Sequence, residues 1–275
     1  MVASGNVLVN RFRQSAFDRL RDSAVVSEGD LIKTGDKSVT RLKFEEDSVL
    51  LLQSNSLLSI QSSRKVIQSP AIKVRVKLLE GRAENAANQK HEKNRSFEVQ
   101  TPSAVAVVRG TEFRFNANDV VTAEETLSGV VDFGVDAALV SVVKDYGSTA
   151  KQGQPPTPPS SLPNMPSLVG FKENIEYLPV ELEIAPQQEV KAFVAKLATD
   201  EAFNTLVYEG VVPASGAHKN LLAFKALHDG QYFLKLRAKD KLGLEGRDAN
   251  VSFNLDAYPY PPEPIIAENG LTGDE

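Results

Sequence analysis

The segment SFEVQTPSAVAVVRGTEFRF, residues Ser96 to Phe115, shows most clearly how the first half of this chain is built. Phe97 and Val99 alternate with Glu98 and Gln100, which is the pattern of a strand with one buried face. After a turn at Pro102, residues 105–108 are apolar at every position. That run predicts a strand covered on both faces.

A polar corner then interrupts the apolar run. Arg109, Gly110 and Thr111 stand there, and alternation resumes at Glu112 and Phe113. Glycine allows a sharp turn or a close approach between strands, while the hydroxyl and the opposite charges of Arg109 and Glu112 can satisfy buried polar groups. We therefore interpret this segment as architectural rather than catalytic.

The segment TPSAVAVVRGTEF resembles the signature TPTAVAGVRGTEF of the FecR-type domain of bacterial cell-envelope proteins. The resemblance covers most of residues 5–153, in the order and spacing of the family. In two departures, Asp47 and Ser48 lack the usual intervening glycine, and Val107 stands where many members have glycine. The resemblance assigns family-motif positions, which we interpret as structural: Gly29, Asp30, Thr34, Gly35, Thr101, Pro102, Arg109, Gly110, Thr111, Glu112 and Phe113.

Residues 5–153 are predicted to be an all-β domain. Short alternating segments at 39–44, 49–52 and 57–60 are separated by polar turns, as in a chain that winds round a core in successive rungs. The FecR resemblance implies a β-roll or β-solenoid-like wrap. Residues 12–21 have spacing compatible with a helical turn or two, and residues 82–95 are predicted to be an exposed hairpin tip or loop.

Residues 154–166, QPPTPPSSLPNMP, form the clearest boundary in the chain. They contain six prolines in 13 positions. Proline lacks the N–H that a sheet or helix requires, so we expect a semi-rigid extended linker that adds to neither.

Residues 167–256 have the pattern of a small antiparallel sandwich, with candidate strands at 167–171, 180–184, 192–198, 206–212, 221–227, 230–239 and 249–255. Residues 227–246 resemble the ending of fibronectin type III and related immunoglobulin-like domains. That resemblance implies that Tyr232 anchors a corner through its hydroxyl. There is no tryptophan, so Phe193 or Phe224 is expected at the centre of the core. Residues 257–275 are predicted to be an extended acidic tail.

Composition limits the classes of function. The chain has 275 residues and a net charge of −5, and no run of 18 apolar residues exists to span a bilayer. The acidic second half disfavours a nucleic-acid partner. Lys73, Arg75 and Lys77 are interpreted as the solvent face of a strand rather than a polyanion site. Cysteine is absent, which excludes disulfides and thiolate metal sites.

The sequence offers few candidates for catalysis. His91, His218 and His228 each stand alone in a predicted loop. Ser62 and Ser148 are each followed three residues later by a lysine, but neither serine lies on a predicted helix, which enzymes with a serine–lysine nucleophile require. The acidic residues 45–47 are expected to be a solvated turn. We predict no enzyme activity, no cofactor and no bound metal.

Three functional hypotheses follow. We expect a non-enzymatic periplasmic binding or scaffold protein that associates with peptidoglycan or an envelope protein, because the domain combination resembles that of envelope proteins with a LysM module. A strand edge is the expected contact mode. The alternative, implied by the best-known FecR members, is a regulator that relays a signal from an outer-membrane receptor to an extracytoplasmic sigma factor. A wall-polymer hydrolase is the least favoured. No secretion signal is visible, so we expect the signal peptide to have been removed or to lie outside this segment.

Overall fold

The computed structural model describes residues 1–12, 14–44, 49–65, 72–86, 95–108, 112–135, 138–215 and 219–257. Strands, turns and irregular segments account for all of these residues. Among them no helix is long and apolar enough to cross a membrane. The predicted all-β class is confirmed.

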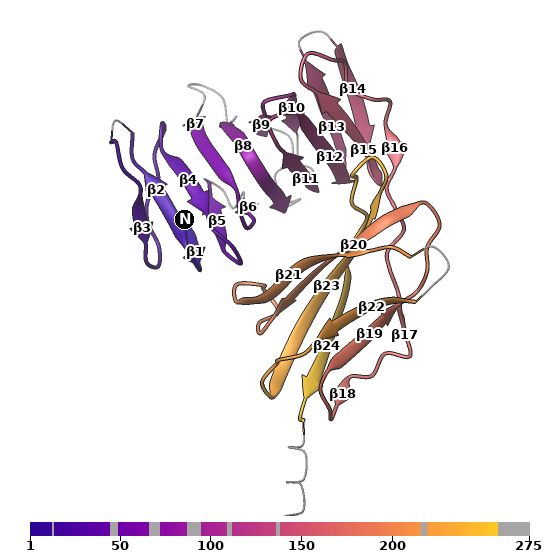
Figure 1. The fold of residues 1–275 in the computed structure, drawn as a ribbon. Helices are drawn as coiled ribbons and strands as arrows, with labels where there is room; N and C mark the ends of the chain where they lie inside the picture. The colour runs from indigo at the N-terminus through magenta and orange to yellow at the C-terminus, as the bar shows by residue number, and fades with distance from the viewer. Residues whose placement is uncertain are drawn as a thin grey trace, which may run out of the picture.

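The first half of the chain is a β-roll of two facing sheets (Figure 1). Sheet A contains β1 (Val2–Ser4), β5 (Val39–Lys43), β6 (Val49–Leu52), the second part of β8 (Ile72–Ala86), β11 (Glu112–Ala117), β12 (Val121–Ser128), β15 (Tyr146–Lys151) and β16 (Ser160–Ser161). Sheet B contains β2 (Val7–Asn10), β3 (Asp18–Leu20), β4 (Leu31–Thr34), β7 (Leu57–Lys65), the first part of β8, β9 (Arg95–Gln100), β10 (Val105–Val108), β13 (Val130–Val135) and β14 (Ala138–Val143).

The chain visits the two sheets alternately. It places β5 and β6 in sheet A, β7 and the first part of β8 in sheet B, and the second part of β8 in sheet A. From β9 it makes two strands in sheet B, then two in sheet A, and repeats this order to β16. Neighbouring strands are antiparallel, except that β8 and β9 run parallel. The winding is thus that of a roll, and its rungs are antiparallel pairs.

Strand β8 joins the two sheets. Its first part pairs with β7 and β9, and the part from Gly81 onward pairs with β6 and β11. Gly81 has φ +94°, and a Cβ there would lie 2.2 Å from Ser56 Oγ. Because glycine permits this bend, the strand continues to Ala86. The prediction of a loop starting at residue 82 is therefore wrong for residues 82–86.

A row of phenylalanines fills the roll. Phe44, Phe97, Phe113, Phe115 and Phe133 contact one another in that order, with ring centroids 5.2–6.3 Å apart. The aliphatic residues of both sheets surround them. Three of the five rings come from residues 96–115, so the alternation in that segment builds the core.

Residues 105–108 differ in part from their prediction. In β10, Ala106 and Val108 are buried, but Val105 and Val107 are only half-buried. They lie on the outer face of sheet B, so the strand is fully covered on one face only.

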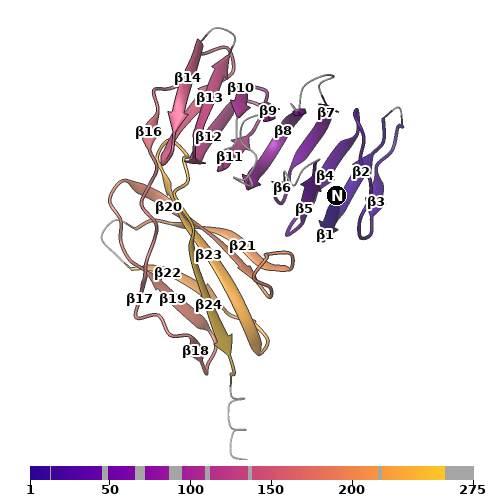
Figure 2. The same ribbon diagram turned by 180° about the vertical axis from the view of Figure 1, so that it is seen from behind.

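Residues 168–255 form a sandwich of two sheets that lies below the roll in Figures 1 and 2. Sheet C contains β17 (Leu168–Val169), β19 (Val180–Ile184) and β22 (Asn220–Phe224). Sheet D contains β18 (Asn174–Ile175), β24 (Ala249–Leu255), β23 (Gly230–Asp240), β20 (Val190–Ala198) and β21 (Leu206–Pro213). Phe193, Phe224 and Phe253 are buried in the core between these sheets.

The proline-rich linker does join a sheet, contrary to the prediction. Ser160 and Ser161 form β16, which pairs with β15, and the Thr157 amide donates to the Thr149 carbonyl at 2.8 Å. The non-proline positions keep their N–H groups, so the linker forms the edge of sheet A without placing proline inside it.

Residues 12–21 likewise differ from the prediction of a helical turn. Asp18–Leu20 form β3, which pairs with β2 at the edge of sheet B. Pairing with a neighbouring strand overrides a weak local helical spacing.

Candidate functional site

Charged side chains line the outer face of sheet A. On neighbouring strands, Arg114 of β11 stands opposite Glu84 of β8 and Glu125 of β12, so the three form one row. Arg82 lies two residues from Glu84 and therefore on the same face of β8. Arg114 and Glu125 are each only 3% exposed, so another part of the chain must cover this row.

Sheet D of the sandwich provides the cover. Strand β20 is buried at every position from Ala192 to Ala198, because one face packs in the sandwich core and the other faces the roll. Lys196 of β20, Arg237 of β23 and Glu245 of the loop between β23 and β24 reach sheet A. These contacts hold the sandwich against the roll.

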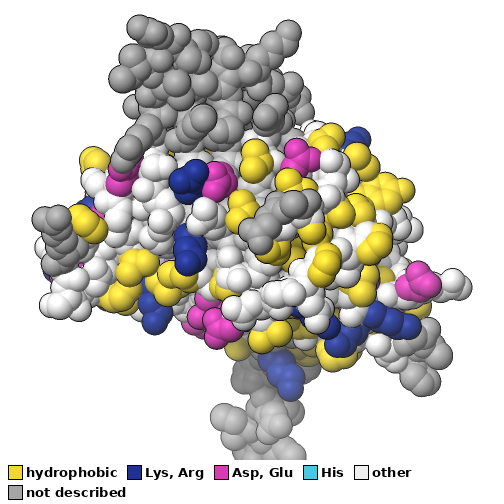
Figure 3. Space-filling view, turned by 90° about the horizontal axis from the view of Figure 1, so that it is seen from above, with side chains coloured by type: hydrophobic (Ala, Val, Ile, Leu, Met, Phe, Trp, Pro, Cys, Tyr) yellow, Lys and Arg dark blue, Asp and Glu magenta, His cyan; other side chains and the backbone are white. Residues whose placement is uncertain are grey.

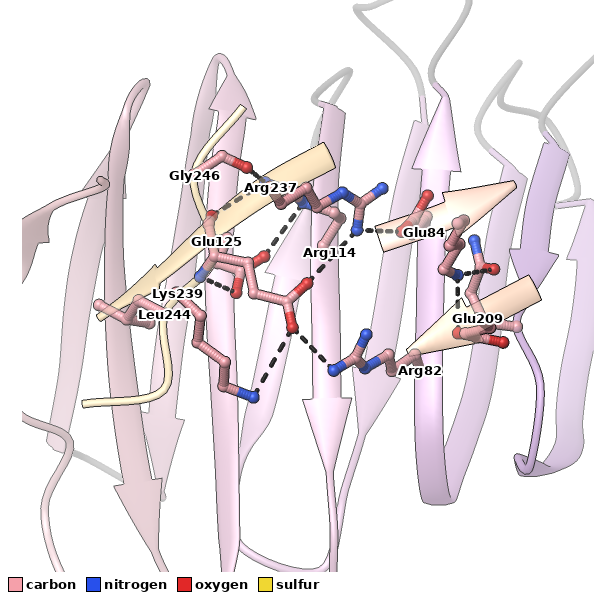
Figure 4. Close-up of polar contacts among 12 residues, drawn as sticks. Arg82, Glu84, Arg114, Glu125, Glu209, Arg237, Lys239, Leu244 and Gly246 are labelled. Atoms are coloured by element: carbon pink, nitrogen blue, oxygen red, sulfur yellow. Dashed lines mark hydrogen bonds and ion pairs between the residues drawn. The ribbon is translucent and has the colours of Figure 1, made fainter. Parts of the chain in front are cut away.

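Five cations and five carboxylates meet between the two domains. Figure 4 labels Arg82, Glu84, Arg114, Glu125, Glu209, Arg237 and Lys239 among them. We call this set the interdomain charge cluster: Arg82, Glu84, Arg114, Glu125, Lys196, Glu209, Arg237, Lys239, Glu245 and Asp248.

Arg114 joins sheet A to the loop after β23. Its Nε lies 3.0 Å from Glu125 Oε2, and its Nη2 donates to the carbonyls of Glu245 at 3.0 Å and Gly246 at 2.7 Å. The Glu245 amide donates to Glu125 Oε1 at 2.7 Å. The side chains of Arg114 and Glu125 thus bond the backbone carbonyls and an amide of residues 245 and 246. These charge-assisted bonds fix the loop in one position on sheet A.

Arg237 and Glu245 form the centre of the cluster. Arg237 Nη1 lies 2.7 Å from Glu84 Oε1 and 3.5 Å from Glu245 Oε2, and its guanidinium also pairs with Asp248. Glu245 Oε1 lies 2.7 Å from Arg82 Nη2. Arg237 thus links its own domain to the roll through Glu84.

A third group of contacts surrounds Lys196. Its ammonium lies 3.2 Å from Glu209 Oε1 on the neighbouring strand and donates to Gln53 Oε1 of the roll. Apolar contacts continue the interface beyond it, where Val39 and Leu51 of the roll pack with Phe203 and Leu206 of the sandwich.

Burial shifts the pKa of several acids in the cluster. Burial, only partly offset by Arg114, raises the pKa of Glu125 to about 7. For Glu245, burial acts in the same direction, but Arg82, Arg237 and Arg114 outweigh it and lower its pKa. The pKa of Glu84 is likewise lowered, because Arg237 and Lys196 outweigh its burial. Glu125 is therefore the member that titrates near neutral pH.

The cluster is suited to holding two domains together. Each charge has an oppositely charged partner, and removing one partner of a buried pair leaves an uncompensated charge in a low dielectric. Among the described residues, no group of three or more His, Cys, Asp or Glu residues could hold a metal ion. We interpret the cluster as an interdomain clamp.

Residues 30–132 match the family model described as FecR protein. This chain contains a FecR domain. The resemblance drawn from residues 96–115 is therefore confirmed. FecR domains are found in envelope-associated proteins. The comparison with curated proteins found no match.

Solved structures that resemble the chain include two of a candidate anti-sigma factor from Parabacteroides distasonis ATCC 8503. Both are 16% identical and cover 48% of this chain and 59% of that one, with TM-scores of 0.39 and 0.38. A third is the extracellular domain of a candidate one-component system, BT4673, from B. thetaiotaomicron. It is 8% identical and covers 92% of this chain and 57% of that one, with a TM-score of 0.26. The matches span less than two thirds of each of these chains.

In the FecR domain, the motif residues near position 30 bind backbone groups at a corner. The Asp30 carboxylate accepts from the amides of Phe12 at 3.0 Å and Ser27 at 2.9 Å and pairs with Arg11 at 2.9 Å. Burial raises the pKa of Asp30, but the two amides and Arg11 outweigh it and lower the pKa. Gly29 has φ +88° and lies against the Phe12 ring, where a side chain would clash.

The motif residues at the other corners of the FecR domain make similar contacts. Thr34 Oγ1 donates to the Gln53 carbonyl at 2.5 Å, and the Gly35 amide donates to the Asn6 carbonyl at 2.9 Å. Thr101 Oγ1 donates to the Ala104 carbonyl and accepts from the Ala104 amide, both at 3.0 Å. These side chains satisfy backbone groups at turns, as structural residues do.

The remaining motif residues lie apart from the charge cluster. Phe113 is fully buried in the core of the FecR domain, Pro102 is half-buried in the turn before β10, and Glu112 is exposed. In the sandwich, the Tyr232 hydroxyl donates to the His228 carbonyl at 2.7 Å. Arg109, Gly110 and Thr111 lie outside the described residues, as do the acidic residues 45–47, His91 and His218.

The serine–lysine pairs do not form a nucleophile site. Ser148 is buried in β15, where its hydroxyl donates to the Thr157 carbonyl at 2.7 Å. A spacing of three along a strand places Ser148 and Lys151 on opposite faces. Ser62 also lies in a strand, β7, and not in a helix. A helix would bring such residues together.

The basic segment of β8 does not form a continuous cationic surface. Arg75 pairs with Glu98 of β9 at 2.9 Å and is exposed. Seen from the side of the roll opposite the sandwich, acidic and basic side chains are scattered among hydrophobic and uncharged ones (Figure 3).

Sequence reasoning missed the charge cluster. Glu84 falls within the predicted loop at residues 82–95, and Arg114 and Glu125 occupy the polar side of alternating strands, where a solvent-facing side chain is the usual interpretation. The available signal was the density of opposite charges on both candidate surfaces: Arg82 and Glu84 in the roll, and Arg237 and Glu245 in the sandwich.

Proposed function

We propose that this protein is a non-enzymatic regulator of the bacterial cell envelope, whose FecR domain binds a protein of an envelope signalling system. The observation that carries the proposal is the FecR match over residues 30–132. In the best-known FecR members, this domain meets the signalling domain of an outer-membrane receptor and controls an extracytoplasmic sigma factor. The same relay is the proposed role here, in the periplasm.

The contacts of the ionisable side chains support a binding role. The buried acids and bases at the domain interface pair with one another, and the buried serine of the candidate catalytic pair bonds the backbone. The motif residues Asp30, Thr34 and Thr101 satisfy turns. Such a framework holds a rigid surface for a partner.

The clamp limits the face of the FecR domain that we propose for partner contact. The sandwich covers the outer face of sheet A through Arg114, Glu125 and Glu84. On the outer face of sheet B, Lys33 and Arg75 are exposed. We therefore place partner contact on sheet B.

The wall-scaffold hypothesis ranks second. It rests on the resemblance to LysM-bearing envelope proteins, whereas the FecR match favours the regulator. Binding to peptidoglycan stays a prediction.

A binding assay tests the proposal. The purified chain is immobilised, and the periplasmic signalling domains of outer-membrane receptors encoded in the same genome are passed over it. We expect at least one to bind with micromolar affinity or better. Lys33→Glu/Lys77→Glu on sheet B is expected to weaken binding about tenfold, which corresponds to about 1.4 kcal/mol.

The matched control is Lys172→Glu/Lys225→Glu, which changes the net charge equally but lies on the sandwich. It is expected to leave the affinity unchanged. If no receptor domain binds, and the chain co-sediments with purified peptidoglycan, the regulator hypothesis is wrong and the scaffold hypothesis is supported.

A further inference from the structure

A cavity of about 310 Å³ lies at one edge of the interface between the FecR domain and the sandwich. Its size falls at the lower end of the range for small-ligand sites, which often form between domains. The residues that line it are Asp36, Ser54, Asn55, Gly81, Arg82, Asn116, Val194, Glu209, Gly210 and Val211.

The wall from the FecR domain is rigid. It consists of corners where the chain passes between sheets A and B. Asn55 has φ +54°, and its amide donates to the Gly35 carbonyl at 3.0 Å. The Gln53 amide donates to the Arg82 carbonyl at 2.9 Å, which ties this corner to β8. The backbone of this wall is thus held in place before any ligand arrives.

Among the parts of the chain that the structure describes, two buried polar atoms of the cavity lining find no hydrogen-bond partner: Ser54 Oγ and Glu209 Oε2. Ser54 is only 8% exposed. Burial raises the pKa of Glu209, but Lys196 and the nearby Ser54 hydroxyl outweigh it and lower the pKa. The two groups are therefore close, although no hydrogen bond of good geometry joins them. An unpartnered buried polar group is costly, which favours a ligand that supplies the missing bonds.

The charges around the cavity limit the chemistry of that ligand. An anion would face the carboxylates of Asp36 and Glu209. A cation would face Arg82, which is held by Glu245 at 2.7 Å, and the nearby Lys196. An apolar molecule would find only two aliphatic side chains, Val194 and Val211, in a polar wall.

A neutral molecule with many hydroxyl groups avoids both the like-charge repulsion that an ion would meet and the burial of unpaired polar groups that an apolar molecule would cause. Its hydroxyls can donate to the carboxylates of Asp36 and Glu209 and accept from the amide of Asn116 and the guanidinium of Arg82. We propose that this cavity binds a neutral saccharide of one or two sugar units. This inference is independent of the proposed regulator function.

Because the cavity lies between the two domains, a bound ligand is expected to contact both of them. Asp36, Asn55 and Asn116 belong to the FecR domain, whereas Glu209 and Val211 belong to the sandwich (Figure 4 shows Arg82 and Glu209 near each other). A ligand that touches both walls binds the docked arrangement and not the separated one. Binding therefore stabilises the domain interface.

Calorimetric titration of the full chain with cellobiose, maltose and chitobiose tests the inference, with citrate and spermidine as charged probes. We expect at least one disaccharide to bind and to raise the melting temperature, and the charged probes not to bind. Asp36→Asn/Asn116→Ala is expected to weaken binding at least tenfold, and Asn116→Leu, which fills the cavity, to abolish it.

The control Asp18→Asn/Asn250→Ala makes the same chemical changes at exposed positions far from the cavity and is expected to bind like the wild type. The melting temperature without sugar shows whether each variant is folded. The inference is overturned if no disaccharide binds, if citrate or spermidine binds instead, or if the cavity variants bind as tightly as the control. Receptor-domain binding by the same variants is measured separately, so the two proposals fail independently.

Discussion

Glu125 is the residue whose ionisation couples the domain interface to pH. It lies in the row with Arg114 and Glu84, accepts from the Glu245 amide at 2.7 Å, and has a pKa raised to about 7 by burial. An unfolded glutamate has a pKa of about 4.5. Between pH 4.5 and pH 7, Glu125 is therefore protonated in the folded protein and ionised in the unfolded chain.

We predict that the free energy of unfolding falls as pH rises from about 5 to 7.5. In that window the folded state binds more protons, so raising the pH favours unfolding; the shift of Glu125 corresponds to about 3 kcal/mol. Glu124, whose pKa burial also raises well above its usual value, acts in the same direction. Glu84, Glu209 and Glu245 act oppositely, since their lowered pKa values give stability that is lost as pH falls below about 4.5. Urea unfolding measured from about pH 3 to pH 7.5 tests both the loss of stability at acidic pH and the loss toward neutral pH.

Glu125→Gln isolates the contribution of Glu125. The amide stays neutral at all pH values and keeps an oxygen for the Glu245 amide, so the slope between pH 5 and 7.5 is expected to flatten. Glu181→Gln, at an exposed position of the sandwich, serves as control and is expected to keep the wild-type slope. An unchanged slope in Glu125→Gln would show that another group titrates.

At the scale of elements, the pattern of apolar residues predicts most strands correctly. The segments expected at 49–52, 180–184 and 249–255 match β6, β19 and β24. The errors fall where long-range pairing or a bend decides the outcome. Residues 82–86 continue β8 past Gly81, and residues 160–161 of the linker pair with β15.

Gly81→Ala is expected to lower the free energy of unfolding by about 3 kcal/mol or more. An alanine pays about 1–2 kcal/mol for a left-handed backbone, and here its Cβ would lie 2.5 Å from Ser56 Cα, which the backbone must move to relieve. Gly153→Ala is the matched control, because φ is +73° but nothing lies within 4 Å of its Cβ. It is expected to cost only about 1–2 kcal/mol. Equal losses in the two variants would mean that the contact with Ser56 does not constrain β8.

At the scale of the whole molecule, two domains share one buried interface. Charged pairs occupy its centre, and apolar contacts around Val39 and Phe203 occupy one end. Outside the cluster, Arg247 pairs with Asp145 at 2.6 Å. Because the Arg237–Glu84 and Arg82–Glu245 pairs join one domain to the other, we expect the two domains to unfold together.

Arg237→Met is predicted to separate the unfolding of the two domains. It leaves Glu84 without its closest cation, and breaking such a buried pair costs about 3–5 kcal/mol. Scanning calorimetry should show one transition for the wild type and two for the variant. Lys219→Met breaks the exposed pair with Glu183 and is expected to cost at most about 1 kcal/mol and keep one transition. Two transitions in the wild type would contradict a clamping role for the cluster.

The order of residues along the chain predicts the all-β class and the FecR domain, and it marks residues 154–166 as a proline-rich segment. These follow from local properties: side chains alternate along strands, and glycine, proline and short polar residues mark turns. The motif from residue 96 to 115 predicted the core, because Phe97, Phe113 and Phe115 lie on one face of their strands.

The environment of the polar faces depends instead on how the two domains pack together. Arg114 and Glu125 have the alternation of solvent-facing residues, and nothing near them in sequence shows that Glu245, 120 residues further along the chain, covers them. Whether a charged side chain is solvated or buried depends on the docking of one domain on another. The interdomain charge cluster and the cavity beside it therefore exist only in the folded, docked chain.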